Sequence, residues 1–196
     1  MNRVEKYCYD VLNGKIKAGN SIKFSVKRFL NDLEKSKNNP NFPYYFDENS
    51  ANEIINFAET LVLAEGSNKK PLKLYPFQTF ILMNIHGWRY KNNSSIRRFR
   101  ESYVQISRQC GKSMLSGVLV SFYSNFQDYQ YPQCYLCATK MEQAKIVFNE
   151  IKKFLNADAE LGEMFRIQDW KSEIQCKNTN GVIKCLGRDT KSLDGL

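Results

Sequence analysis

The sequence predicts an α/β protein in which a parallel sheet follows a helical N-terminal region. Two observations carry this prediction. Between residues 101 and 155 the apolar runs alternate as strand, helix, strand and helix, an order typical of parallel strands joined by right-handed crossovers. Before residue 90 the apolar residues instead recur at helical spacing, and turn-forming residues separate the segments. The chain is therefore expected to hold helices first and the sheet second.

The N-terminal elements follow from local signals. Two short helices are expected between residues 3 and 36, separated by Gly14 and Gly19. The next helix starts near Ser50, which forms a capping-box pattern with a glutamate three residues later, and it is expected to end near Gly66. Another helix opens at Pro76, because proline is favoured in the first turn of a helix.

The alternating part begins with a strand around 101–106 and a helix that reaches about residue 125. A second strand (134–138) and a second helix (141–155) follow. Two strands around Asn180 and Gly181, at 173–177 and 182–186, then predict a hairpin. If its turn has two residues, Cys176 and Cys185 face each other across the strands.

Composition and charge indicate an ordinary globular protein with an affinity for polyanions. The chain is 42% hydrophobic and 25% charged, with a net charge of +9. Residues 1–100 carry nearly all of this excess, and residues 69–100 contain eight basic residues and no acidic one. Such a segment favours nucleic acid, and a solvated basic face is the alternative. No apolar run approaches the ~20 residues that span a bilayer, and charges interrupt any N-terminal signal, which predicts a cytoplasmic protein without membrane contact.

Cys134 and Cys137 have the C-x-x-C spacing of zinc and redox sites. They lie in the second expected strand, where residues three apart point to opposite faces, so packing in the core is the favoured interpretation. A cytoplasmic compartment also disfavours a disulfide between Cys176 and Cys185.

The segment with the clearest chemistry lies between the first strand and its helix, where Gly111, Lys112 and Ser113 are consecutive. At a strand-to-helix junction, this triplet is the core of a phosphate-binding loop. The helix start offers backbone N–H groups, the lysine reaches the outer phosphate oxygens, and the serine hydroxyl can bind Mg²⁺. The usual first glycine of the pattern would fall at Ile106 and is missing. Arg108, inside the loop, is either a surface arginine or a charge that stabilises a transferring phosphoryl group.

The loop, Ser-Arg-Gln-x-Gly-Lys-Ser, resembles the deviant Walker A motif of the large terminase subunits of tailed bacteriophages, ATPase motors that package DNA. In that family the first glycine is commonly absent, and an arginine stands where Arg108 does. Further stretches resemble the family's motifs in the same order along the chain: residues 11–16, 29–34, 74–82 with Gly87 and Trp88, 97–100 and 138–144. Phe77 replaces the tryptophan that is usual in the third of these stretches.

The resemblance implies a P-loop NTPase fold of the RecA-like kind and a role for each residue of the loop. Lys112 would hold the β- and γ-phosphates of ATP, Ser113 would bind Mg²⁺, and Gly111 would let the backbone approach the phosphates. Arg108 would act in cis as a catalytic arginine together with Lys112. Gln78 resembles the family's adenine-reading glutamine, since an amide can pair with adenine in a bidentate way; an exposed polar residue is the alternative. The remaining nucleotide-binding candidates are Ser107, Gln109 and Cys110.

The resemblance also implies a division into a helical lead-in, 1–68, and an ATPase domain, 69–196. No apolar strand ending in the Mg²⁺-binding aspartate and catalytic glutamate is found after residue 140, and residues 192–196 resemble the segment just upstream of that strand. The nuclease carboxylates of the family are also missing. The chain is therefore expected to be the N-terminal part of a longer protein, binding ATP but hydrolysing it poorly.

The function implied by the resemblance is ATP-driven packaging of double-stranded viral DNA into a procapsid. The expected partners are DNA, the terminase small subunit and the portal protein, with a homo-oligomer for the full-length protein in the host cytoplasm. Two other classes remain open: a helicase-like P-loop ATPase acting on nucleic acid, and a non-catalytic fragment that binds DNA or a protein partner. Steep salt dependence of DNA binding without nucleotide binding would favour the fragment.

Overall fold

The computed structural model describes residues 2–65 and 68–187, and the chain divides into two compact units. The first unit comprises Met1–Asn56 and Lys73–Gln105, and the second comprises Phe57–Leu72 and Ile106–Leu196. These units are defined by contacts, so each combines two stretches of sequence. The division into domains 1–68 and 69–196 stays a prediction.

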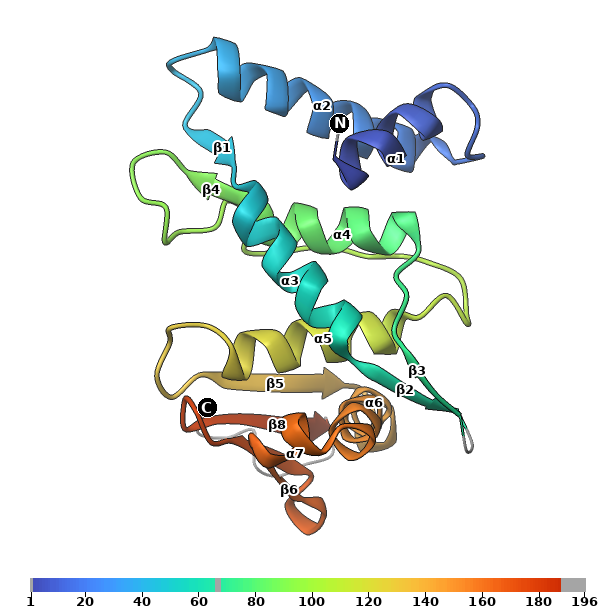
Figure 1. Cartoon of the computed structure of the whole chain (residues 1–196), viewed down its shortest axis with the longest axis vertical. Helices are drawn as coiled ribbons and strands as arrows, with labels where there is room; N and C mark the ends of the chain where they lie inside the picture. Colours follow the sequence, from blue (N-terminus) through green and yellow to red (C-terminus); the bar gives the residue numbers. More distant parts are fainter. Residues whose placement is uncertain (1, 66–67, 188–196) are drawn as a thin grey trace. The chain divides into compact units, whose positions relative to one another are not determined.

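The first unit is mainly helical (Figure 1). Its elements are α1 (Arg3–Leu12), α2 (Asn20–Asn38), β1 (Tyr44–Phe46), most of α3 (Glu48–Thr60), α4 (Pro76–Gly87) and β4 (Trp88–Tyr90). Strands β1 and β4 pair in antiparallel orientation. The core is aromatic: the Phe29 ring makes edge contacts with Phe46, Phe80 and Trp88 at centroid distances of 5.1, 6.0 and 5.8 Å. The helices at 3–36 and at Pro76 are thereby confirmed.

The second unit contains a small sheet with helices packed against it. Its elements are β2 (Val62–Glu65), β3 (Asn68–Pro71), α5 (Lys112–Asn125), β5 (Gln133–Ala138), α6 (Met141–Ala157), α7 (Ala159–Glu163), β6 (Phe165–Gln168), a 3₁₀ turn (Asp169–Lys171), β7 (Glu173–Cys176) and β8 (Gly181–Gly187). The sheet has the strand order β5-β8-β7-β6. Helices α5 and α6 pack closely at Gly117 of α5, where an added Cβ atom would lie 3.3 Å from the Phe154 ring of α6.

The sheet is mixed, which corrects the expectation of a parallel one. Among the described strands, only β5 and β8 run parallel, whereas β8–β7 and β7–β6 are antiparallel. The strand expected around 101–106 is also wrong, since these residues have no regular secondary structure and Tyr103 is 87% exposed. An apolar run becomes a strand only when a neighbouring strand satisfies its backbone groups. In the described part of the chain, no strand pairs with this run.

Two local predictions are also wrong. Helix α3 is capped by Asp47 rather than Ser50: the Asp47 carboxylate accepts from the Ser50 N–H at 3.1 Å and from its hydroxyl at 3.0 Å. The helix ends at Thr60 rather than near Gly66, which lies outside the described residues. Residues 192–196, which resemble a family segment, also lie outside them.

The hairpin of β7 and β8 is confirmed, but its connection is longer than two residues. Cys176 pairs with Gly181, so Cys185 does not face Cys176, and both are free thiols. In the described residues, no helix combines the length and apolarity that crossing a bilayer requires.

Candidate functional site

The loop 107–113 leads into α5 through a sharply turned backbone. Gln109 and Gly111 both adopt the left-handed conformation, with φ of +62° and +77°, and Gly111 is the residue that precedes the helix. Glycine takes this conformation without strain, whereas Gln109 does not. No side chain caps the N-terminus of α5. The first N–H groups of a helix have no partner within it, so this end of α5 can receive an anion.

Lys112 is the first residue of α5, and its side chain folds back over the loop. The Lys112 Nζ donates to the carbonyl oxygens of Ile106 at 2.6 Å and Ser107 at 2.8 Å. Two neutral carbonyls leave the ammonium charge uncompensated, and the residue is exposed. Because a charged acceptor makes a stronger hydrogen bond than a neutral one, an anion at the loop would compete well for this lysine.

The other loop residues differ in exposure. Ser107, Arg108 and Gln109 are exposed, whereas Cys110 and Ser113 are half-buried. The exposed loop leaves room for a ligand to approach, and Ser113 lies in the first turn of α5. The residues that the sequence predicted for phosphate binding therefore lie in one exposed loop, with Lys112 at the N-terminus of α5.

Gln78 lies in the first unit, on α4, whereas the loop lies in the second. Its side chain is 3% exposed, so the alternative of an exposed polar residue is wrong. The Gln78 Oε1 accepts a hydrogen bond from the Tyr75 N–H at 2.9 Å, which closes the first turn of α4. The amide thus has a structural role at the helix start, and its role toward adenine stays a prediction.

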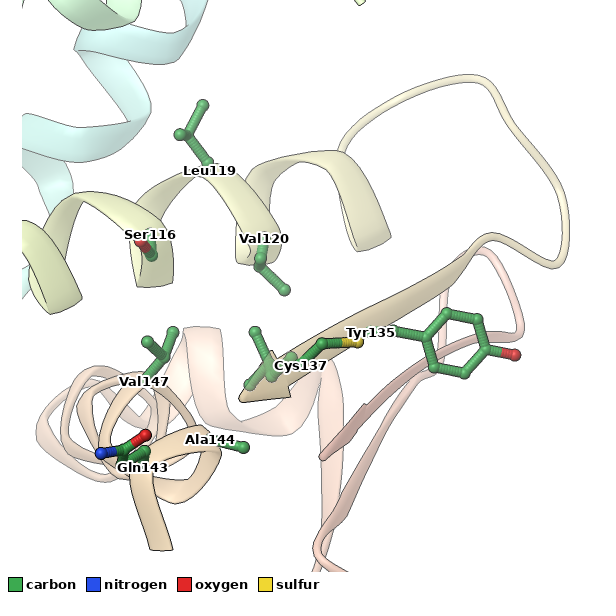
Figure 2. Close-up of a pocket in the computed structure, with 9 residues that line it drawn as sticks. Ser116, Leu119, Val120, Tyr135, Cys137, Gln143, Ala144 and Val147 are labelled. Carbon is green, nitrogen blue, oxygen red and sulfur yellow. The ribbon is translucent and has the colours of Figure 1, made fainter. Parts of the chain in front are cut away.

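Sequence reasoning missed a cavity in the second unit. It has a volume of about 330 Å³ and lies between α5, β5 and α6 (Figure 2). Most of its lining is apolar, and Ser116 and Gln143 are its polar members. The Gln143 Oε1 accepts from the Thr139 hydroxyl at 2.9 Å, which joins the end of β5 to the start of α6. Three consecutive residues of β5, Tyr135, Leu136 and Cys137, line the cavity, so no alternation along the strand marks it in the sequence.

The basic segment 69–100 does not form one open surface. Arg89 is 8% exposed, and Arg98 is ion-paired with Asp32 at 2.8 Å, with its guanidinium 4.4 Å from the Tyr44 ring centre. Lys69 donates to the Ala157 carbonyl at 2.8 Å, and Lys91 donates to the Ser36 carbonyl at 3.1 Å. Several of its cations therefore stabilise the fold of their own unit.

The cysteines show no sign of metal binding. Cys134 and Cys137 lie on β5, the first half-buried and the second exposed, so the prediction that both pack in the core is wrong for Cys137. Across the residues that the structure describes, no three His, Cys, Asp or Glu side chains gather to hold a metal ion. Burial raises the pKa of the Cys176 and Cys185 thiols to about 11, which keeps them protonated.

Comparison with known proteins shows the family. Residues 76–196 match the family described as "Terminase large subunit, ATPase domain", which is more than half of the chain. The chain is also similar in structure to the large terminase of bacteriophage HK97, with a TM-score of 0.63 and 24% identity. That match covers 74% of this chain and 29% of the HK97 protein, so the chain spans less than a third of its length. No curated protein matches the chain by sequence. The chain therefore belongs to the family of terminase large subunit ATPase domains.

Proposed function

We propose that the loop 107–113 binds ATP with Mg²⁺, and that the chain serves as the ATPase region of a motor that moves double-stranded viral DNA into a procapsid. The observation that carries this proposal is the Lys112 ammonium, held over the loop at the uncapped start of α5. A chain of the terminase ATPase family with this arrangement has the groups that phosphate binding requires. The small mixed sheet is then one part of a P-loop NTPase fold of the RecA-like kind.

The residues of the loop fit this ligand pair in chemical terms. Lys112 would exchange two neutral carbonyl acceptors for β- and γ-phosphate oxygens, which are charged and therefore stronger acceptors. Gly111 has no side chain to block the approach of a phosphate, and the Ser113 hydroxyl is a suitable oxygen ligand for Mg²⁺. Mg²⁺ keeps several waters and needs few protein ligands. ATP supplies the phosphoryl group, and Mg²⁺ neutralises part of its charge.

The remaining roles are proposed on the same basis. Arg108, exposed within the loop, places a permanent cation where charge develops during phosphoryl transfer. Backbone N–H groups from Ser107, Gln109 and Cys110 would surround the phosphates, and Gln78 would read adenine. By family membership we propose the terminase small subunit and the portal protein as partners, and a homo-oligomer for the full-length protein.

The test is nucleotide binding, measured with a fluorescent ATP analogue and Mg²⁺. Lys112→Ala should weaken binding by about tenfold or more, equivalent to about 1.4 kcal/mol, because the phosphates lose their cation. Lys140→Ala is the matched control, since Lys140 is another exposed lysine at the start of a helix in the same unit. Its affinity should stay within about twofold of the parent chain.

Equal affinities of Lys112→Ala and the parent chain would contradict the proposal. Hydrolysis is a separate readout on the same samples. Because no catalytic glutamate is recognised after residue 140 of the sequence, residues 1–196 should turn over ATP only slowly. Rapid turnover that Lys112→Ala abolishes would support the nucleotide site and show that residues 1–196 already contain the catalytic base.

A further inference from the structure

The most concentrated positive charge that remains exposed in the first unit lies on α2. Residues 11–31 contain five basic residues and no acidic one. Four residues on the N-terminal half of α2 form what is here called the α2 basic face: Lys23, Phe24, Lys27 and Arg28. We propose that the α2 basic face binds the phosphate backbone of double-stranded DNA.

The face follows from helical geometry. Lys23 and Lys27 are four residues apart, as are Phe24 and Arg28, so the four side chains are neighbours on two successive turns. Val26 and Phe29 point the other way and are buried, with exposures of 0% and 1%. Those residues hold the helix on the core, and the α2 basic face lies on the opposite side of the helix. All three cations of the face are exposed.

In the described residues, none of the three cations on this face forms an ion pair. The acidic residues that flank the stretch 11–31 in the sequence pair with other cations. Asp10 pairs with Lys15 at 3.6 Å, and Asp32 pairs with Arg98 at 2.8 Å. The Arg28 guanidinium makes a cation–π contact 5.0 Å from the centre of the Phe99 ring, and the residue as a whole is exposed. The face is therefore a local source of positive potential.

Phe24 adds an apolar surface to this face. It is 69% exposed and lies on the same side of α2 as the three cations. Beside a DNA backbone, the ring can cover the apolar face of a sugar while the neighbouring cations bind phosphates.

Duplex DNA fits the face better than other polyanions for two reasons. Its charges repeat regularly along a line, as the cations of a helix do, and binding releases condensed counterions. The segment 69–100, the strongest candidate by sequence, has several of its cations engaged in structural contacts. The proposal relies on the proposed function only for the choice of DNA as partner, and it needs nothing from the loop 107–113.

The experiment measures binding of the whole chain to a labelled duplex of about 20 base pairs by fluorescence anisotropy, at salt concentrations from about 50 to 200 mM. The test variant is Lys23→Gln, Lys27→Gln and Arg28→Gln combined. The matched control is Lys140→Gln, Lys171→Gln and Lys177→Gln combined, which removes the same charge from exposed positions of the second unit. Circular dichroism confirms that both variants are folded.

The test variant should bind DNA at least about tenfold more weakly, and its log–log salt slope should be shallower by about two to three, since each lost phosphate contact removes about 0.9. The control should lose less than about threefold. Phe24→Ser should weaken binding by a smaller factor and leave the salt slope unchanged.

Equal losses in the two variants would mean that overall charge decides binding, and the proposal would fail. It would fail as well if the test variant kept its DNA affinity. Binding to polyglutamate is measured in the same way, and a variant that loses affinity for polyglutamate but not for DNA would assign the face to an acidic protein. Binding of the ATP analogue, measured on the same samples, should be the same in both variants. The DNA proposal and the ATP proposal can therefore fail separately.

Discussion

His86 is the single histidine of the chain, and its side chain is fully buried on α4. Burial lowers its pKa to about 3, helped by the positive charges of Arg89 and Arg97 and opposed by Asp47. An unfolded histidine has a pKa of about 6.5. Between these two values the unfolded chain therefore binds a proton that the folded chain does not. The contribution of His86 to stability is complete above pH 6.5 and falls as the pH is lowered through this window.

This linkage gives a prediction for acid stability. From pH 7 to pH 5, the free energy of unfolding of the first unit should fall by about 2 kcal/mol, because each full pH unit in the window costs about 1.4 kcal/mol. His86→Gln has no titrating ring, so its unfolding free energy should be lower at pH 7 yet nearly constant down to pH 5. Urea unfolding at pH 5, 6 and 7 measures both. A variant that keeps the slope would show that another group causes it.

At the same scale, the site residues differ in how well sequence predicts them. Lys112 and Gly111 are recognisable because their role depends on neighbours in the chain, and the hydrogen bonds of Lys112 to residues 106 and 107 are local. The burial of Gln78 is not local. It depends on how α4 packs in the first unit, and a polar residue on a helix gives no sign of this in the sequence.

At the scale of elements, one buried hydroxyl connects α5 to the loop between β7 and β8. Thr179 is 4% exposed, its hydroxyl donates to the Ser124 carbonyl at 2.5 Å, and it accepts from the Gly181 N–H at 3.2 Å. Its backbone carbonyl also accepts from the Tyr131 N–H at 2.7 Å, which holds the start of β5 to the same loop. The end of α5 and the start of β5 are thereby both fixed to the loop between β7 and β8 by one residue.

Thr179→Val should lower the free energy of unfolding of the second unit by about 1–3 kcal/mol, because it leaves a buried carbonyl and a buried N–H without their partner. Thr179→Ser is the control, since it keeps the hydroxyl and loses only a methyl group. Urea unfolding followed by circular dichroism at pH 7 compares the two. If serine costs as much as valine, packing of the methyl group is what matters, and the hydrogen-bond argument is wrong.

The elements that sequence predicts correctly are those with local causes. Helix α4 opens at Pro76, and Gly14 takes a positive φ of +76° between the first two helices. The apolar residues of the run 101–106 have the pattern of a strand, so the sequence predicts one there. A strand also requires a neighbouring strand to hydrogen-bond with, and the pattern of one segment does not show whether such a neighbour exists.

Caps and turns are predicted less well because near neighbours compete. Asp47 and Ser50 are both good helix caps, and the hydrogen bonds show that the aspartate accepts while the serine donates. In the hairpin, Asn180 takes the left-handed conformation that its type allows, with a φ of +55°. The pairing of Cys176 with Gly181 nevertheless gives a turn longer than two residues, because Gly181 already belongs to β8.

At the scale of the whole molecule, each unit contains one of the two tryptophans. Trp88 is 1% exposed and packs between Phe29 and Phe46 in the first unit, whereas Trp170 is 80% exposed in the second. An exposed indole changes its surroundings little on unfolding, so the shift of tryptophan emission reports on Trp88. Far-ultraviolet circular dichroism, in contrast, follows the helices of both units.

These two signals can show whether the units unfold separately. Each unit has its own core, so we expect two transitions and different midpoints by the two probes. Lowering the pH from 7 to 5 should move the emission midpoint through His86, while Thr179→Val should move only the circular dichroism transition. Trp170→Phe should retain nearly all of the emission shift. If Thr179→Val moves both midpoints equally, α3, which passes from one unit into the other, transmits stability between them and the chain unfolds as one cooperative body.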